Sequence, residues 1–155
     1  MALINALDQI AEQKHREIAL VICPHPREID DPFELHARTI RVVVSRNGET
    51  RDVALTSDLV TGISSVFLVE SCYLGCLTVS LQPGLCLPDA LPTNHLGFSR
   101  AVYREDEIKS VLEELLFDKE SMLSTQARLA GLQTDGRSTE RVMNVIYQMI
   151  GFEHV

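Results

Sequence analysis

Four cysteines include a pair whose spacing could bind a metal ion. Cys72 and Cys76 stand in a Cys-x-x-x-Cys arrangement, within the spacing range of zinc ligands, which need four soft or borderline donors in tetrahedral array. The remaining ligands could come from Cys23, Cys86, His25 and His95. The alternative is simple packing, because free cysteines are among the most buried residues and this pair lies in an apolar stretch. We predict no metal and no cofactor, and keep zinc as a hypothesis.

The segment Cys23-Pro-His25 could supply a thiolate nucleophile and a base. Residues i and i+2 of an extended segment point the same way, so contact is feasible, although Pro24 limits adjustment. The alternative is a buried cysteine at a strand end followed by a loop histidine. The chain lacks the Gly-x-Gly-x-x-Gly, Gly-x-Ser-x-Gly and His-Glu-x-x-His motifs. We therefore assign no catalytic residue, lean against an enzyme, and keep a thiol- or zinc-dependent enzyme as an alternative.

Acidic residues gather between positions 104 and 120 of a chain whose net charge is −8. Such a surface could dock on a basic partner or imitate a phosphate backbone, and it could equally be a solvated helix face. The overall charge disfavours direct binding to nucleic acid. The acidic residues are Glu105, Asp106, Glu107, Glu113, Glu114, Asp118 and Glu120.

Aromatic residues concentrate in the C-terminal half, where Phe98, Tyr103, Phe117, Tyr147 and Phe152 lie. Aromatic side chains are enriched in protein interfaces, and they also fill small cores that lack tryptophan. We predict a protein-binding surface from both groups. Its residues would be Glu105, Asp106, Glu113, Glu114, Phe117, Tyr147 and Phe152.

The first 56 residues predict a helix, a strand and a hairpin. Apolar residues at helical spacing indicate a helix over residues 3–13, and the apolar run 18–23 indicates a strand. Two β-branched runs, 39–45 and 50–56, flank Asn47-Gly48. Asn-Gly between strand-like runs is typical of a tight hairpin, because both turn positions need positive φ.

The middle of the chain is ambiguous between strand and helix. We predict buried strands over 64–71 and 76–82, with a helix over 57–74 as the alternative, because periodicity cannot resolve short apolar runs. Prolines 83, 88 and 92 then make a long irregular segment, of a kind that is often functional or mobile. A further short strand is expected over 97–103.

The last third is helical. The spacing of Ile108, Val111, Leu112 and Leu115 predicts a helix, and a second helix should cover 119–130 and end at Gly131. A third helix begins near Ser138. Its apolar face is Val142, Val145, Ile146, Met149 and Ile150.

These elements predict one α+β domain spanning residues 1–155. An antiparallel β-meander of four or five strands would carry the N-terminal helix and about three C-terminal helices on one face. This order of elements, with the small size and acidic charge, resembles class I secretion chaperones, which implies a chaperone of that kind as one alternative.

We expect a non-catalytic protein-binding module, acting as an adaptor, chaperone or inhibitor through surface complementarity. A nucleic-acid-mimicking inhibitor is a further alternative. The partner would be another protein, and a homodimer could form through the helix at 138–150. Without a basic region near the start or a long apolar segment, we expect no membrane association and a cytoplasmic location.

Overall fold

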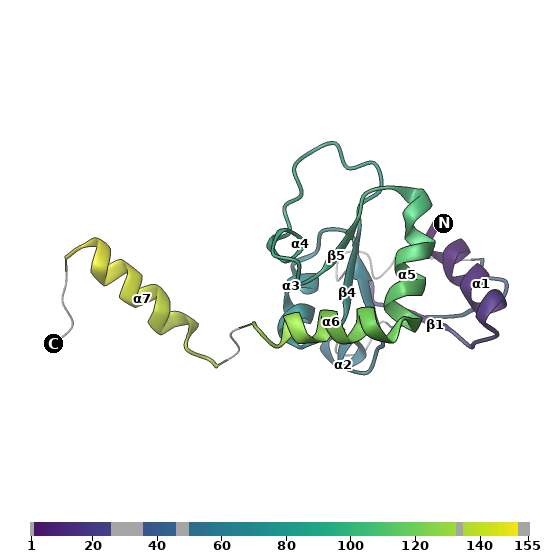
Figure 1. The fold of residues 1–155 in the computed structure, drawn as a ribbon, viewed down its shortest axis with the longest axis horizontal. Helices are drawn as coiled ribbons and strands as arrows, with labels where there is room; N and C mark the ends of the chain where they lie inside the picture. The colour runs from purple at the N-terminus through teal and green to yellow at the C-terminus, as the bar shows by residue number, and fades with distance from the viewer. Residues whose placement is uncertain (1, 26–35, 46–49, 133–134, 152–155) are drawn as a thin grey trace.

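A computed structural model describes residues 2–25, 36–45, 50–132 and 135–151 (Figure 1). Helices and short strands alternate along most of this length. In chain order the elements are α1 (Ala2–Lys14), β1 (Ala19–Ile22), β2 (Arg41–Val44), α2 (Thr50–Leu55), β3 (Val60–Gly62), α3 (Val66–Tyr73), β4 (Thr78–Leu81), α4 (Pro92–His95), β5 (Arg100–Val102), the 3-10 turn η1 (Glu105–Glu107), α5 (Ile108–Phe117), α6 (Lys119–Leu129) and α7 (Ser138–Met149).

The strands pair in parallel, in two small sheets. β1 pairs with β2, with Ala19 opposite Arg41, and the second sheet has the order β3-β4-β5. Within the described ranges no strand pair is antiparallel, so the predicted antiparallel meander is wrong. A parallel pair cannot be closed by a tight turn and needs a crossover connection. Crossover connections therefore join the paired strands of this chain.

The predicted hairpin is also wrong. Its first strand exists as β2, but β2 pairs with β1, and residues 50–55 form helix α2. Ala54 is buried on the inner side of α2, and its carbonyl accepts a hydrogen bond from the Cys76 thiol at 3.5 Å. Packing against a distant segment thus overrides the local β propensity. Asn47-Gly48 lies outside the described residues.

The middle segment, which the sequence left ambiguous between strand and helix, contains both a helix and a strand. The strand predicted over 64–71 is wrong, because α3 occupies this stretch. Ser65 caps α3 by accepting a hydrogen bond from the Phe67 N–H, and Leu68 and Cys72, four residues apart, are both buried. The strands predicted over 76–82 and 97–103 are confirmed as β4 and β5. All four residues of β4 are buried, as expected for a central parallel strand covered on both faces.

Helices cover both sides of the β4–β5 sheet. Figure 1 shows α3 and α5 on opposite sides of β4. α1 and α5 pack together and form the main hydrophobic core with the strands, where Ile10, Val79, Val102 and Leu112 are fully buried. Leu68 on α3 is buried outside this cluster, against β3 and β4. The result is a layered arrangement of helix, sheet and helix.

The helices predicted at the two ends of the chain are confirmed as α1, α5, α6 and α7. Their packing differs from the expectation for α7, which lies away from the other elements (Figure 1). None of its residues is buried. Of the three C-terminal helices, α5 and α6 pack against each other and α5 also packs against α1. Among the described residues no helix is long and apolar enough to cross a membrane.

A buried carboxylate anchors the chain before β2. Asp8 on α1 accepts hydrogen bonds from the backbone N–H groups of Arg38, Thr39 and Ile40 at 2.8–3.2 Å. Burial alone would raise the pKa of Asp8, but these N–H donors outweigh it and hold the pKa below its ordinary value. Asp8 therefore ties the first helix to the start of the second strand.

Candidate functional site

The carboxyl ends of three parallel strands form one edge of the sheet. β3 ends at Gly62, β4 at Leu81 and β5 at Val102, and each is followed by a loop on the same edge. Open parallel sheets bind ligands outside the carboxyl ends of their strands. We call these loops, residues 63–65 and 82–91 with Tyr103, the carboxyl edge.

A half-buried carboxylate, Asp89, organises the longest of these loops. Its oxygens accept hydrogen bonds from the Leu91 N–H at 2.9 Å, the Gln82 amide at 3.0 Å, the Asn94 amide at 2.6 Å and the Tyr103 hydroxyl at 2.7 Å. Burial alone would raise the pKa of Asp89, but these four donors outweigh it and hold the pKa far below its usual range. Asp89 is therefore ionised at neutral pH and holds an irregular loop in one shape.

The same network reaches the neighbouring strands and loops. Gln82 also donates to the Ser80 hydroxyl at 2.8 Å, and Ser80 donates to the Ile63 carbonyl at 2.5 Å. On the other side the Ser99 hydroxyl donates to the Asn94 carbonyl oxygen and is also hydrogen-bonded to the Thr93 hydroxyl. Gln82, Ser80 and Ser99 are all buried. Hydrogen bonds thus connect the loop after β3, the strand β4 and the segment before β5.

Apolar side chains are also exposed around the carboxyl edge. Ser64 and Ser65 are exposed before α3. Several large apolar side chains of the neighbouring segments are exposed as well. They are Ile63, Val66, Leu85, Leu87 and Leu96. An edge with backbone N–H groups, hydroxyls and apolar side chains can contact both the polar and the flat parts of a small ligand.

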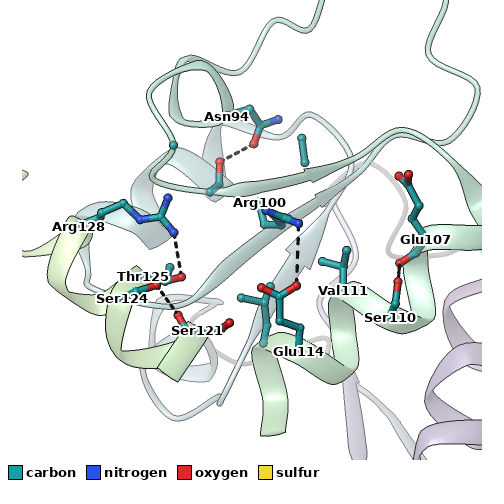
Figure 2. Close-up of a pocket in the computed structure, with 14 residues that line it drawn as sticks. Asn94, Arg100, Glu107, Ser110, Val111, Glu114, Ser121, Ser124, Thr125 and Arg128 are labelled. Atoms are coloured by element: carbon teal, nitrogen blue, oxygen red, sulfur yellow. Dashed lines mark hydrogen bonds and ion pairs between the residues drawn. The ribbon is translucent and has the colours of Figure 1, made fainter. Parts of the chain in front are cut away.

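A polar pocket of about 520 Å³ lies beside β5, between α5 and α6 (Figure 2). Arg100 on β5 and Arg128 on α6 point into it, and Glu114 on α5 lies 3.9 Å from Arg100. Hydroxyl groups make up much of the remaining wall. They belong to Ser99, Ser110, Ser121, Ser124 and Thr125. The pocket shares no lining residue with the carboxyl edge.

Several of the predicted acidic residues form ion pairs within the chain. Asp106 on η1 pairs with Arg104 at 2.6 Å, and Glu113 pairs with Lys14 of α1. Glu114 instead faces Arg100 in the polar pocket. Glu107 also lies 3.8 Å from Arg104, so ion pairs within the chain occupy four of the seven predicted carboxylates.

The predicted aromatic residues are also scattered. Phe117 is part-exposed at the end of α5, Tyr147 lies on α7, and Phe152 is outside the described residues. Phe117 shares α5 with Glu113 and Glu114, whereas Tyr147 lies on the separate helix α7. Their role in binding another protein stays a prediction.

Two of the four cysteines are packing residues, whereas Cys23 is partly buried and Cys86 is exposed. Cys72 and Cys76 are buried, and their thiols donate to different carbonyls, those of Phe98 and Ala54. Burial raises the pKa of both thiols, and also that of Cys23, which disfavours the reactive thiolate. Among the described residues no group of three or more His, Cys, Asp or Glu is arranged to hold a metal ion. The thiol and zinc hypotheses therefore gain no support.

Sequence reasoning missed the residues that build both sites. Asp89, Gln82 and Asn94 lie in or beside the proline-rich segment, for which the sequence predicts only an irregular loop of a type that is often functional. Arg100 and Arg128 carry no motif. The available signal was a buried strand followed directly by Gln82-Pro-Gly84, which is typical of a strand leading into a site.

Parallel strands with helices on both sides make this a Rossmann-like α/β fold. Over 99% of its length the chain matches a putative UDP-N-acetylglucosamine 2-epimerase from Listeria monocytogenes, with a TM-score of 0.61 and 15% identity. Over 96% it matches the glycotransferase of kitacinnamycin, with a TM-score of 0.56 and 18% identity. No model of a known protein family matches the sequence, and no curated protein matches it significantly.

The chain spans about two fifths of the length of these two enzymes, 41% and 39%. Both neighbours are sugar-processing enzymes. The expectation of an adaptor, chaperone or inhibitor, including the resemblance to class I secretion chaperones and the nucleic-acid mimic, is therefore wrong. That expectation relied on the lack of catalytic motifs and on the acidic charge, and the chaperone resemblance relied also on an antiparallel layout that the described strands do not have.

Proposed function

We propose that this chain is the nucleotide-sugar-binding part of a carbohydrate-processing enzyme, and that the ligand lies on the carboxyl edge. The observation that carries the proposal is the likeness in fold, over 99% of the chain, to a protein described as a UDP-N-acetylglucosamine 2-epimerase. A second neighbour with the same type of fold is a glycotransferase. The class of ligand common to such chemistry is a sugar activated by a nucleotide.

The arrangement of the carboxyl edge supports this location. Parallel α/β sheets bind nucleotides outside the carboxyl ends of their strands, with phosphate groups near the start of a following helix. Here β3 leads through Ser64 into α3, and the Asp89 network holds the opposite loop in place. Exposed Ile63 and Val66 offer apolar surface for a base or a sugar ring.

Calorimetry with UDP-N-acetylglucosamine, UDP and free N-acetylglucosamine tests the proposal. We expect UDP-N-acetylglucosamine and UDP to bind with Kd values below about 1 mM, and free N-acetylglucosamine to bind far more weakly. Ser64→Trp places a bulky side chain at the edge and should weaken UDP binding about tenfold or more, a loss of about 1.4 kcal/mol.

Ser138→Trp is the matched control, because Ser138 is exposed on the distant α7. Both variants introduce the first tryptophan of the chain. Equal binding by the two variants would place the ligand elsewhere. Absence of UDP binding by the unmodified chain would exclude this function for it.

A further inference from the structure

The polar pocket beside β5 has a positive group without a carboxylate partner. Arg128 contacts the Thr125 hydroxyl at 3.4 Å, and its guanidinium lies over Gly97. Within the described part of the chain no carboxylate lies at ion-pair distance from Arg128. Arg100, the second cation, is only loosely paired with Glu114 at 3.9 Å. Two guanidinium groups are thus available to an anion.

Three hydroxyl groups of the wall donate their hydrogens to other groups and keep an oxygen that can accept a hydrogen bond. Ser110 donates to the Glu107 carbonyl, Ser121 to the Asp118 carboxylate and Ser124 to the Ser121 carbonyl. Each hydroxyl oxygen can still accept a hydrogen bond, as can the carboxylate of Glu114. The pocket therefore offers arginine donors for an anionic group and several acceptors for hydroxyl hydrogens.

From this division of donors and acceptors, we infer that the pocket binds a small polyhydroxylated anion, such as a sugar phosphate or a sugar acid. Its phosphate or carboxylate would lie between Arg100 and Arg128, where charge-assisted hydrogen bonds are strong. Its hydroxyl groups would donate to the serine and glutamate oxygens. A volume of about 520 Å³ falls within the range of small-molecule sites. The wall has no aromatic side chain, so a nucleoside base would find no stacking partner there.

This site is independent of the proposed nucleotide-sugar site, although hydrogen bonds connect the two. Asn94 lines the pocket and donates to Asp89 of the carboxyl edge at 2.6 Å. Ser99, also in the wall, donates to the carbonyl oxygen of Asn94. The two sites can therefore be tested with different ligands and different variants.

Binding of glucose 6-phosphate and glucuronate to the full chain, measured by calorimetry or NMR, tests the inference. Glucose and inorganic phosphate serve as comparison ligands. We expect at least one of the two sugar anions to bind about tenfold or more tightly than both comparison ligands, because only a sugar anion engages both sets of groups. Comparing the two anions distinguishes a phosphate from a carboxylate ligand.

Two variants locate the binding. Arg128→Gln and Arg100→Gln should each weaken the sugar anion about tenfold or more, with melting temperatures close to that of the unmodified chain. Arg51→Gln, at an exposed position on α2, is the control and should bind normally. A saturating amount of UDP should not displace the sugar anion.

Three results would overturn the inference. They are no binding of either sugar anion, binding no tighter than that of glucose or phosphate, and equal affinities of the arginine variants and the Arg51→Gln control. Displacement by UDP, together with weaker binding of the sugar anion to Ser64→Trp, would assign the sugar anion to the carboxyl edge instead. Loss of UDP binding alone would contradict only the proposed function.

Discussion

At the scale of single residues, two aspartates hold neighbouring segments in place by accepting several hydrogen bonds each. Asp8 is almost completely buried and accepts three backbone N–H groups, while Asp89 collects four donors at the carboxyl edge. Both carboxyl groups have depressed pKa values because donors compensate for lost water. Neither residue belongs to a recognisable motif, since its partners lie at a distance along the chain or inside an irregular loop.

Replacing Asp8 by Ala should destabilise the protein by about 2–3 kcal/mol, because the N–H groups before β2 lose a charged acceptor. Urea unfolding at neutral pH measures this. Glu12→Ala is the control on the same helix, because Glu12 is exposed and, among the described residues, bonds only to the Thr39 hydroxyl. It should change the free energy of unfolding by less than about 0.5 kcal/mol. Equal losses in the two variants would contradict the role of Asp8.

The contribution of Asp8 should also depend on pH. The pKa of this carboxyl lies below 3.8 in the folded chain, so its stabilisation is present above that pH and is lost as the pH falls through the folded value. The difference in stability between the unmodified chain and Asp8→Ala should therefore be constant near neutrality and shrink in acid. If this difference in stability instead grew below pH 4, the pKa of Asp8 would be raised by folding, contrary to the prediction.

At the scale of elements, α3 shows how packing chooses between strand and helix. Its sequence contains β-branched and aromatic residues, yet the chain forms a helix that begins at a serine cap. Leu68, Ser71 and Cys72 are all buried, and their spacing of three and four residues places them on one face of a helix. A strand would instead point residues 68 and 71 to opposite sides. The helical arrangement therefore buries a coherent face.

Leu68→Ala should cost about 2–5 kcal/mol of stability, because Leu68 is fully buried between α3 and the sheet. Val66→Ala, on the same helix but 70% exposed, should leave stability nearly unchanged. Chemical denaturation compares the two variants. An unchanged free energy of unfolding in Leu68→Ala would mean that α3 does not pack on β3 and β4 as described.

At the scale of the whole molecule, α7 is separate from the layered body of helices and sheets (Figure 1). It buries none of its residues, although Val142, Val145 and Met149 form part of an apolar face that is more than half exposed. The core is therefore complete without α7. Pairing of two copies through this face stays a prediction, and light scattering at micromolar concentration checks it.

A chain that ends at residue 132 should melt within about 2 °C of the full chain, because the core loses no contact. Thermal unfolding followed by circular dichroism measures this. The comparison is a chain that ends at residue 118, which also loses α6 with its buried Thr125 and Leu129 and should melt much earlier. A large fall in melting temperature on removing α7 alone would show that α7 packs on the body.

The sequence alone determined the elements with strong periodicity or composition. These are the terminal helices and the strands β1, β2, β4 and β5, because their apolar spacing or β-branched content is sufficient. Only the tertiary structure decided the direction of strand pairing and the helical state of α2 and α3. Pairing direction depends on which distant segments meet, and Asn47-Gly48 next to a β-branched run carries no information about that. The Asp89 network and the arginine pocket could not be predicted from the sequence for the same reason. Their residues come together only because the crossovers of a parallel sheet bring distant segments side by side.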